Sequence, residues 1–162
     1  MSMTHYMELL ATNQPWNLLY YMAVPVVLAE ALVAIEFFLV YRKQTSGPLK
    51  TVSKVITIGL GAYFTFAIFF RLLFTAIPGM QWRTVVDFIA VWSYLLGVVP
   101  LAGMALLELG WIGKAKTADE KMKLHFVLLT VFLVVAHVAM IFGMVNPEIV
   151  ANSGAAGMNS MP

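Results

Sequence analysis

Glu30 and His137 are the ionisable residues of this chain with the most apolar surroundings. Glu30 lies within VVLAEALVAIEFF and His137 within LVVAHVAMIFG. A carboxyl group in such surroundings either keeps its proton or needs a partner, and an imidazole can share a proton with it. Ionisable groups inside a membrane mark proton relays, ion paths or cofactor sites. We therefore expect Glu30 and His137 to form a site for proton transfer or for a quinone. The alternative is that both are neutral and hydrogen-bonded within a bundle.

A second polar group is expected from Glu36, Glu108 and His125. Glu36 follows Glu30 by six residues, a rotation of about 240° around a helix, so the two carboxylates should not share a face. Glu108 and His125 stand at nearly equal distances from the middle of the connection between their apolar runs, so they should meet. We expect Glu36 to point towards Lys54 or towards Glu108 and His125. A carboxylate beside an imidazole can take up protons; a contact that caps two helix ends is the alternative.

Arg71 and Asp87 flank the turn at Met80, nine residues before it and seven after it. They should therefore face each other from two neighbouring helices. One charge at the centre of a bilayer costs at least about 2.5–3.5 kcal/mol, and an ion pair avoids most of that cost. Arg83 is four residues from Asp87 and can compete for it on the same face. We expect a structural salt bridge, with an outward-facing site for an anionic head group or a quinone as the alternative.

A haem b is disfavoured by the histidine spacing. Haem b takes one or two axial ligands, of which His is the commonest. His125 and His137 share one apolar run and stand about 18 Å apart on a helix, so they cannot ligate one iron, and only a His/Met site with Met104 or Met22 remains. A quinone needs only a polar group and aromatic walls. The aromatic residues that could line such a site are Tyr63, Phe64, Trp92 and Tyr94.

The remaining metal chemistry is restricted by composition. The chain has no Cys, which excludes disulfides, Fe–S clusters, thiolate catalysis and covalent haem. No Glu-x-x-His motif is present, which argues against a di-iron site. Thioether and imidazole ligands suit Cu(I), so copper binding is one interpretation of the Met-rich ends. The other is that these methionines only anchor the ends by hydrophobic contact. The residues concerned are Met3, His5 and Met7, with Met158 and Met161 near the other end.

These side chains must be positioned by membrane-spanning helices. The chain has 162 residues, 61% of them hydrophobic and only 11% charged, whereas soluble domains carry roughly 25% charged residues. Four apolar runs are long enough for helices of roughly 20 residues, which leaves room for one membrane domain, residues 1–162, and no soluble domain. The predicted spans are residues 16–41, 52–77, 84–112 and 124–145, followed by a polar tail at 152–162.

The basic residues predict the orientation of these helices. Eight of the ten Lys and Arg residues lie in Arg42–Lys54 and Lys114–Lys123. The excess of Lys and Arg in cytoplasmic loops places both stretches inside and both termini outside. We therefore expect an up-down-up-down four-helix bundle in a bacterial or archaeal cytoplasmic membrane. Thr4–Leu10 should form a short amphipathic helix with Thr4 as its N-cap, and the polar start of the chain does not resemble a signal peptide.

The function predicted from these features is that of a small integral subunit of a larger membrane complex, coupled to redox chemistry or to protons. Its expected partners are the lipid bilayer and other membrane subunits or further copies of itself. The net charge of +2 gives no indication of nucleic-acid binding. We expect no catalytic activity from the chain alone. The alternatives are a proton-coupled permease or metal-ion carrier, and a purely structural scaffold.

Overall fold

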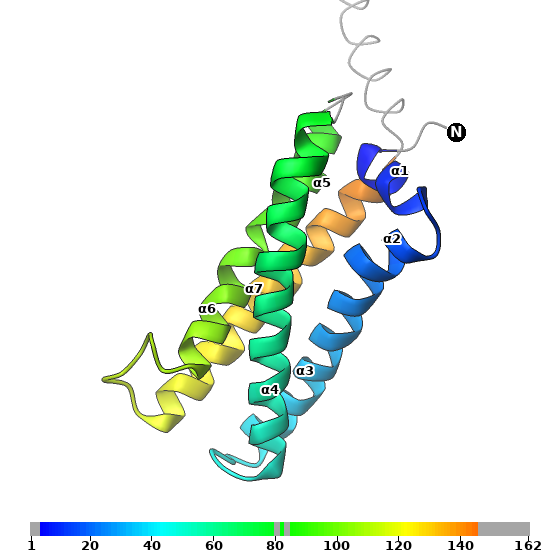
Figure 1. Cartoon of the computed structure of the whole chain (residues 1–162). Helices are drawn as coiled ribbons and strands as arrows, with labels where there is room; N and C mark the ends of the chain where they lie inside the picture. The colour runs from blue at the N-terminus through cyan, green and yellow to red at the C-terminus, as the bar shows by residue number, and fades with distance from the viewer. Residues whose placement is uncertain (1–3, 80–81, 83–84, 146–162) are drawn as a thin grey trace, which may run out of the picture.

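The computed structural model describes residues 4–79, 82 and 85–145, and it folds them into a bundle of long helices (Figure 1). Four helical segments are long and apolar enough to cross a membrane, and no strand occurs in the described ranges. The expected all-helical fold with four spans is thereby confirmed. The predicted tail at 152–162 lies outside the described residues. The four segments are Trp16–Tyr41, Pro48–Gly79, Val85–Glu108 and Ala118–Met144.

Each of the first three spans is divided into shorter elements, and a short helix, α1 (His5–Ala11), precedes them. The first span consists of α2 (Trp16–Leu18), the π-helical η1 (Leu19–Ala23) and α3 (Val24–Tyr41). The second span consists of α4 (Pro48–Ala62), the π-helical η2 (Tyr63–Phe69) and η3 (Leu72–Ala76), and a 3₁₀ turn, η4 (Ile77–Gly79). The third span consists of α5 (Val85–Leu96) and α6 (Val98–Glu108), and the fourth is α7 (Ala118–Met144).

The fourth span begins six residues earlier than the sequence pattern predicts, at Ala118 instead of Leu124. The cause is a capping box. The Thr117 side chain accepts a hydrogen bond from the backbone N–H of Glu120, and the Glu120 carboxylate accepts one from the backbone N–H of Thr117. Two otherwise unpaired donors are satisfied in this way. The basic residues that follow therefore lie on the first turns of a helix and not in a loop.

The other predicted boundaries shift for similar local reasons. The second span begins at Pro48 instead of Val52, because proline is well suited to the first turn of a helix and Gly47 supplies the preceding turn with φ +117°. The third span ends at Glu108 instead of Ile112, and Gly110 follows in the left-handed region with φ +76°. The first span matches its predicted bounds.

Pro25 shapes the first span by leaving one carbonyl group without its helical donor. Proline has no N–H, so it cannot bond to the carbonyl one turn earlier. That carbonyl belongs to Tyr21 in an α-helix and to Tyr20 in a π-helix. Both are taken by tyrosines of other spans: the Tyr94 hydroxyl donates to Tyr21 O, and the Tyr63 hydroxyl donates to Tyr20 O at 2.8 Å. The helix irregularity is thus tied to the second and third spans.

The spans pack mainly against their neighbours in sequence. In the described residues α3 lies against α4, α4 against α6, and α5 and α6 against α7, while a thinner contact between α3 and α7 closes the ring. The tightest approach lies between α4 and α6, where a Cβ at Gly61 would stand 2.7 Å from Ala105 Cβ. At the end that holds α1, the Thr4 hydroxyl donates to the carbonyl of Gly143 in α7. Thr4 also accepts from the Met7 N–H at 3.4 Å, as expected of an N-cap.

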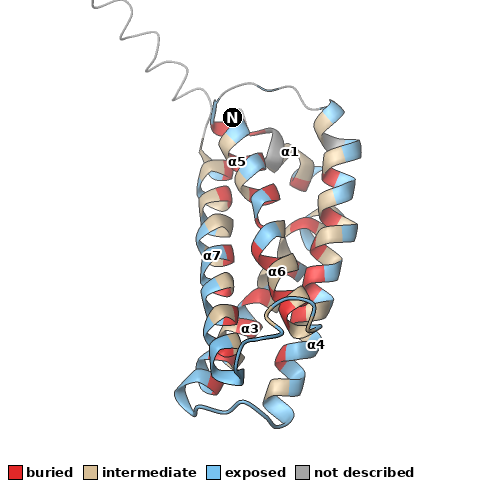
Figure 2. Cartoon of the chain, turned by 90° about the vertical axis from the view of Figure 1, so that its left-hand side faces the viewer, coloured by how far each residue is buried: buried red, intermediate tan, exposed pale blue. Residues whose placement is uncertain are grey.

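Both connections that carry the basic residues lie at one end of the bundle, which we call the basic end (Figure 1). Arg42 and Lys43 close the first span there, and Lys121 and Lys123 open the fourth. Figure 2 shows that buried residues face the bundle axis and exposed residues face outward. Many of the outward side chains are large and apolar, such as Phe66 at 72% exposure. A soluble protein rarely exposes such large apolar patches, so this surface suits contact with lipid.

Candidate functional site

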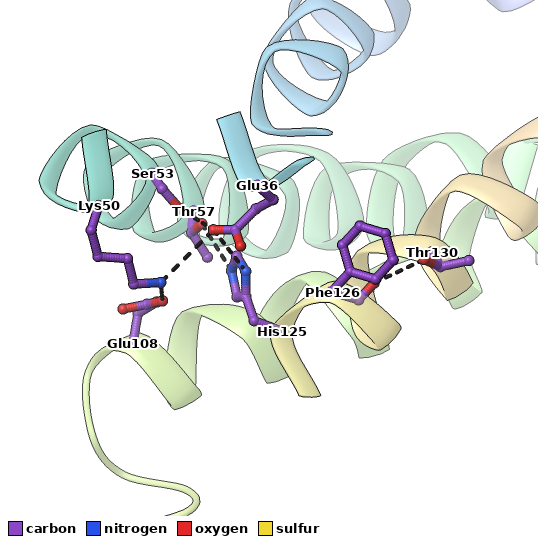
Figure 3. Close-up of polar contacts among 8 residues, drawn as sticks. All are labelled: Glu36, Lys50, Ser53, Thr57, Glu108, His125, Phe126 and Thr130. Carbon is purple, nitrogen blue, oxygen red and sulfur yellow. Dashed lines mark hydrogen bonds and ion pairs between the residues drawn. The ribbon is translucent and has the colours of Figure 1, made fainter. Parts of the chain in front are cut away.

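All four spans contribute side chains to one polar group near the basic end, which we call the polar cluster (Figure 3). It contains three side chains that the sequence pattern does not indicate beside three that it does. Its members are Glu36 from α3, Lys50, Ser53 and Thr57 from α4, Glu108 from α6 and His125 from α7.

The centre of the polar cluster is the pair Glu36 and His125, both completely buried. Glu36 Oε1 accepts a hydrogen bond from the Ser53 hydroxyl and lies 3.2 Å from His125 Nδ1. The other ring nitrogen, Nε2, lies 3.1 Å from Thr57 Oγ1. A buried carboxylate that faces an imidazole at this distance can exchange a proton with it, because the charge that leaves one group is balanced at the other.

The pair retains unused hydrogen-bonding capacity. Within the described structure neither Oε2 of Glu36 nor Nδ1 of His125 has an aligned hydrogen-bond partner. The 3.2 Å approach of Nδ1 to Oε1 is therefore an ion-pair contact whose hydrogen-bond angle is poor. Buried polar atoms without partners are uncommon and costly, and they are found where a site must change state. A small rotation of the imidazole would align Nδ1 with the carboxylate.

Lys50 and Glu108 close the polar cluster towards the basic end. The Lys50 ammonium donates to Glu108 Oε1 at 2.6 Å and lies 3.8 Å from Glu36 Oε1. Lys54, the lysine that the sequence offers as a partner of Glu36, is exposed, whereas Lys50, one turn earlier on α4, is only 22% exposed. Lys50 thus connects the two carboxylates of the third and first spans.

A narrow pocket opens beside this lysine. It has a volume of about 140 Å³, and its polar walls come from Thr45, Lys50, Glu108 and Lys121. At about 30 Å³ for each water molecule, it has room for several. Sites for organic cofactors typically measure roughly 300–1,000 Å³. The pocket therefore suits water and protons better than a quinone.

Glu30 and His137 do not form the expected pair within one chain. Both side chains are exposed, and no hydrogen bond or ion pair joins them in the described structure. His137 Nδ1 lies 2.7 Å from the carbonyl of Leu133 in its own helix. The physical reason lies in the phase of α3, which buries Ala29, Leu32 and Glu36 and turns Glu30 outward. A role for Glu30 and His137 in a site between chains stays a prediction.

The expected ion pair at the opposite end is described only in part. Asp87 is completely buried near the start of α5. Arg71 is exposed, and its guanidinium lies 5.4 Å from the centre of the Tyr20 ring in the first span. No ion pair joins Arg71 to Asp87 in the described structure. Arg83 lies outside the described residues, so its contact with Asp87 stays a prediction.

Most of the residues of the copper alternative lie outside the described part of the chain. Met3, Met158 and Met161 lie outside the described residues, and His5 is described only as the first residue of α1. Met7 packs against the core. The described ranges contain no group of three His, Asp or Glu side chains arranged to hold a metal ion.

Lys50, Ser53 and Thr57 are the members of the polar cluster that sequence reasoning missed. Their signal is the spacing of three and four residues, which places all three on one face of a helix. That face could be recognised because each is a polar residue at the end of an apolar run. Ser and Thr are common in membrane helices as packing residues, however, so their presence alone does not indicate a site.

Comparison with known proteins gives a family and no activity. The family model described as "Family of unknown function (DUF6803)" matches residues 1–159. No curated protein and no solved structure matches the chain.

Proposed function

We propose that this chain, which belongs to the DUF6803 family, is an integral membrane subunit of a larger assembly whose buried Glu36–His125 pair takes up and passes on protons. The observation that carries this proposal is the completely buried carboxylate 3.2 Å from a completely buried imidazole. Oε2 of Glu36 and Nδ1 of His125 can each gain a hydrogen bond.

Proton exchange within the pair follows from the cluster's charges. Lys50 and Glu108 neutralise each other at 2.6 Å. The remaining pair carries no net charge either as carboxylate and imidazolium or as carboxylic acid and imidazole. A proton that moves between Nδ1 and Oε1 leaves the net charge of the buried cluster unchanged, which avoids the large cost of an isolated charge in apolar surroundings. A proton taken up from outside gives the pair a charge of +1, and the pair returns to neutrality when it passes that proton on.

The basic end supplies the route for protons. The pocket of about 140 Å³ ends at Lys50 and Glu108, which lead to Glu36. The concentration of Lys and Arg at this end supports a cytoplasmic location for it by the positive-inside rule. Proton uptake would then occur from the cytoplasmic side.

Membership of a larger assembly is supported by Glu30 and His137. Glu30 lies near the middle of the first span, His137 lies in the last third of the fourth, and both are exposed on the surface of the single chain. A charged group at the centre of a bilayer costs at least about 2.5–3.5 kcal/mol. A neutral His137 uses Nδ1 for the Leu133 carbonyl, and its Nε2 has no hydrogen bond within the described structure. A second membrane protein, or a second copy of this chain, would supply partners for both side chains.

The proton proposal is tested by NMR of the chain with ¹⁵N-labelled histidine in lipid nanodiscs. The His125 signals are assigned with His125→Asn and followed across the pH range in which free histidine titrates. Glu36→Gln should change the protonation state or tautomer of His125, whereas the matched variant Glu30→Gln should leave it unchanged. If His125 keeps one state at every pH and is indifferent to Glu36→Gln, the pair is structural and the proposal fails.

The assembly proposal needs a separate measurement. The tagged chain is extracted from its native membrane in mild detergent, and the particle mass and visible spectrum are recorded. We expect a particle that contains other membrane proteins or further copies, and that dissociates with Glu30→Gln and His137→Gln. Phe66→Leu, on the same type of outward surface, is the control. A single chain in both wild type and variants would contradict the proposal.

A further inference from the structure

A second pocket, far from the polar cluster, lies between the first and second spans near the end that holds α1. Its volume is about 420 Å³, three times that of the pocket at the basic end. Its walls combine one cation, aromatic rings and a polar rim. The residues that define this character are Asn13, Trp16, Leu19, Tyr20, Tyr63 and Arg71.

Arg71 provides the charge of this pocket. It lies eight residues inside the end of the second span at Gly79 and is exposed. Its guanidinium stands over the ring of Tyr20 at 5.4 Å, a cation–π contact that holds it in place without neutralising it. In the described part of the chain no carboxylate lies within 4 Å of Arg71. Among the described residues, none forms an ion pair with this positive charge, which suits it to an anionic ligand.

The tyrosines beside Arg71 already donate their hydroxyl protons to backbone carbonyls, which also holds their rings in place. Tyr20 donates to the carbonyl of Ala67, and Tyr63 donates to the carbonyl of Tyr20, both at 2.8 Å. The lining residues that can still donate to a ligand include Arg71, Asn13 and Trp16. A pocket that combines these donors with one cation and has no acidic side chain in its lining suits an anion.

Arg71 lies in the half of the second span that ends at Gly79, away from the basic end, and Trp16 begins the first span. Trp16 and Tyr20, at the start of the first span, have the aromatic character typical of the interface. Arg71 also stands between the π-helical segments η2 and η3, and π-helical turns occur frequently at functional sites.

We propose that this pocket binds the head group of an anionic phospholipid. The phosphate oxygens accept hydrogen bonds from Arg71 and from Asn13, and an acyl chain follows Leu19 and Val24, which are 41% and 40% exposed. The pocket has no acidic side chain in its lining. It therefore offers no ion pair to the ammonium group of a zwitterionic lipid, and charge complementarity favours a lipid with net negative charge.

The test uses the full chain, purified in detergent, depleted of lipid and examined by native mass spectrometry. Phosphatidylglycerol is added in one series and phosphatidylcholine in another, with glycerol phosphate as a head group that lacks acyl chains. We expect phosphatidylglycerol to be retained about tenfold better than phosphatidylcholine, and Arg71→Gln to remove that preference. Glycerol phosphate alone should bind too weakly to be detected.

Two further variants keep the Arg71→Gln test interpretable. Lys54→Gln removes one exposed charge at the basic end and should bind phosphatidylglycerol as the wild type does. Asn13→Gly removes the side-chain amide, keeps the left-handed φ of +54° that Asn13 adopts, and should weaken binding by a few-fold even if Arg71→Gln does not fold. Equal retention of the two lipids by the wild type would overturn the proposal, as would an unchanged preference in both Arg71→Gln and Asn13→Gly. The histidine NMR experiment is unaffected by either result.

Discussion

The imidazole Nδ1 of His125 lies 3.2 Å from the carboxylate of Glu36, and this contact joins the first span of the bundle to the last. Both side chains are closed to solvent. The contact lies where α3 ends and α7 begins, at the end of the molecule that carries the basic connections. The bundle thus brings a potential proton donor and acceptor together from helices that otherwise touch only sparsely.

Breaking this pair from one side should destabilise the protein more than removing it altogether. In Glu36→Leu the buried His125 loses its carboxylate, and truncation of one partner of a buried pair typically costs about 3–5 kcal/mol. Glu36→Leu/His125→Leu leaves neither group unpaired and should cost less than Glu36→Leu alone. Reversible unfolding in mixed micelles measures both. If the double variant loses the sum of the two single losses, the side chains are not coupled.

Two glycines of α4 should respond in opposite ways to the same substitution. A Cβ at Gly61 would stand 2.7 Å from Ala105 Cβ and 2.9 Å from the Leu101 carbonyl oxygen, whose backbone cannot move aside cheaply. Gly61→Ala should therefore lower the free energy of unfolding by about 1–3 kcal/mol. A Cβ at Gly59 meets nothing within 4 Å, so Gly59→Ala should be neutral or stabilise by up to about 1 kcal/mol. If Gly61→Ala cost as little as Gly59→Ala, α4 and α6 would have to be further apart than in the structure.

The bond from Tyr94 to the carbonyl of Tyr21 should matter only because of Pro25. Tyr94→Phe leaves this buried carbonyl without a donor, at a cost of about 1–3 kcal/mol. In a Pro25→Ala background the new N–H can bond to Tyr21 O within the helix, so Tyr94→Phe should cost less there. A double-mutant cycle on unfolding free energies measures the difference. Equal costs in both backgrounds would mean that Pro25 does not create the need for Tyr94.

The orientation is testable because the chain contains no Cys. Thr12→Cys and Lys116→Cys each introduce a single thiol, at exposed positions at opposite ends of the bundle. With intact cells, a membrane-impermeant maleimide should label the Thr12→Cys variant and not the Lys116→Cys variant. After the membrane is opened, both variants should react. Labelling of the Lys116→Cys variant alone in intact cells would reverse the orientation and place the basic end outside.

The number and positions of the spans could be predicted from the sequence because they depend on length and composition. Each apolar run is longer than a bilayer requires, and turn residues stand between the runs. The prediction errors lie at the helix boundaries, where a single hydrogen bond can determine the residue at which a helix begins. The capping box of Thr117 and Glu120 starts α7 six residues early, although the same two residues could have been recognised as an N-terminal signature.

The side-chain pairs were harder to predict because the spans are apolar on every side. In a soluble protein the polar face of a helix indicates which way it points, and a helix that is hydrophobic all round gives no such indication. Glu36 and Glu30 lie on different faces of the first span, as their spacing predicts. Nothing in the sequence says which of the two faces inward, and the structure turns Glu36 in and Glu30 out.

The same difficulty applies to Lys50 and Lys54. Both lie near the start of α4, one turn apart, and a shift in where the helix enters the membrane exchanges their roles. The early start at Pro48 brings Lys50 within 2.6 Å of Glu108. The partner of a buried charge is therefore fixed by the helix boundary, which sequence patterns locate least accurately.

The bond from Thr4 to Gly143 spans 139 residues of sequence, and it sets an order of events during biosynthesis. The Gly143 carbonyl is synthesised after the first three spans, so the bond to Thr4 forms only once the fourth span is in place. The segment that contains α1 can contact α2 and α5 before then. Its attachment to α7 is therefore the later of its contacts, and a chain that stalls before the fourth span lacks this bond.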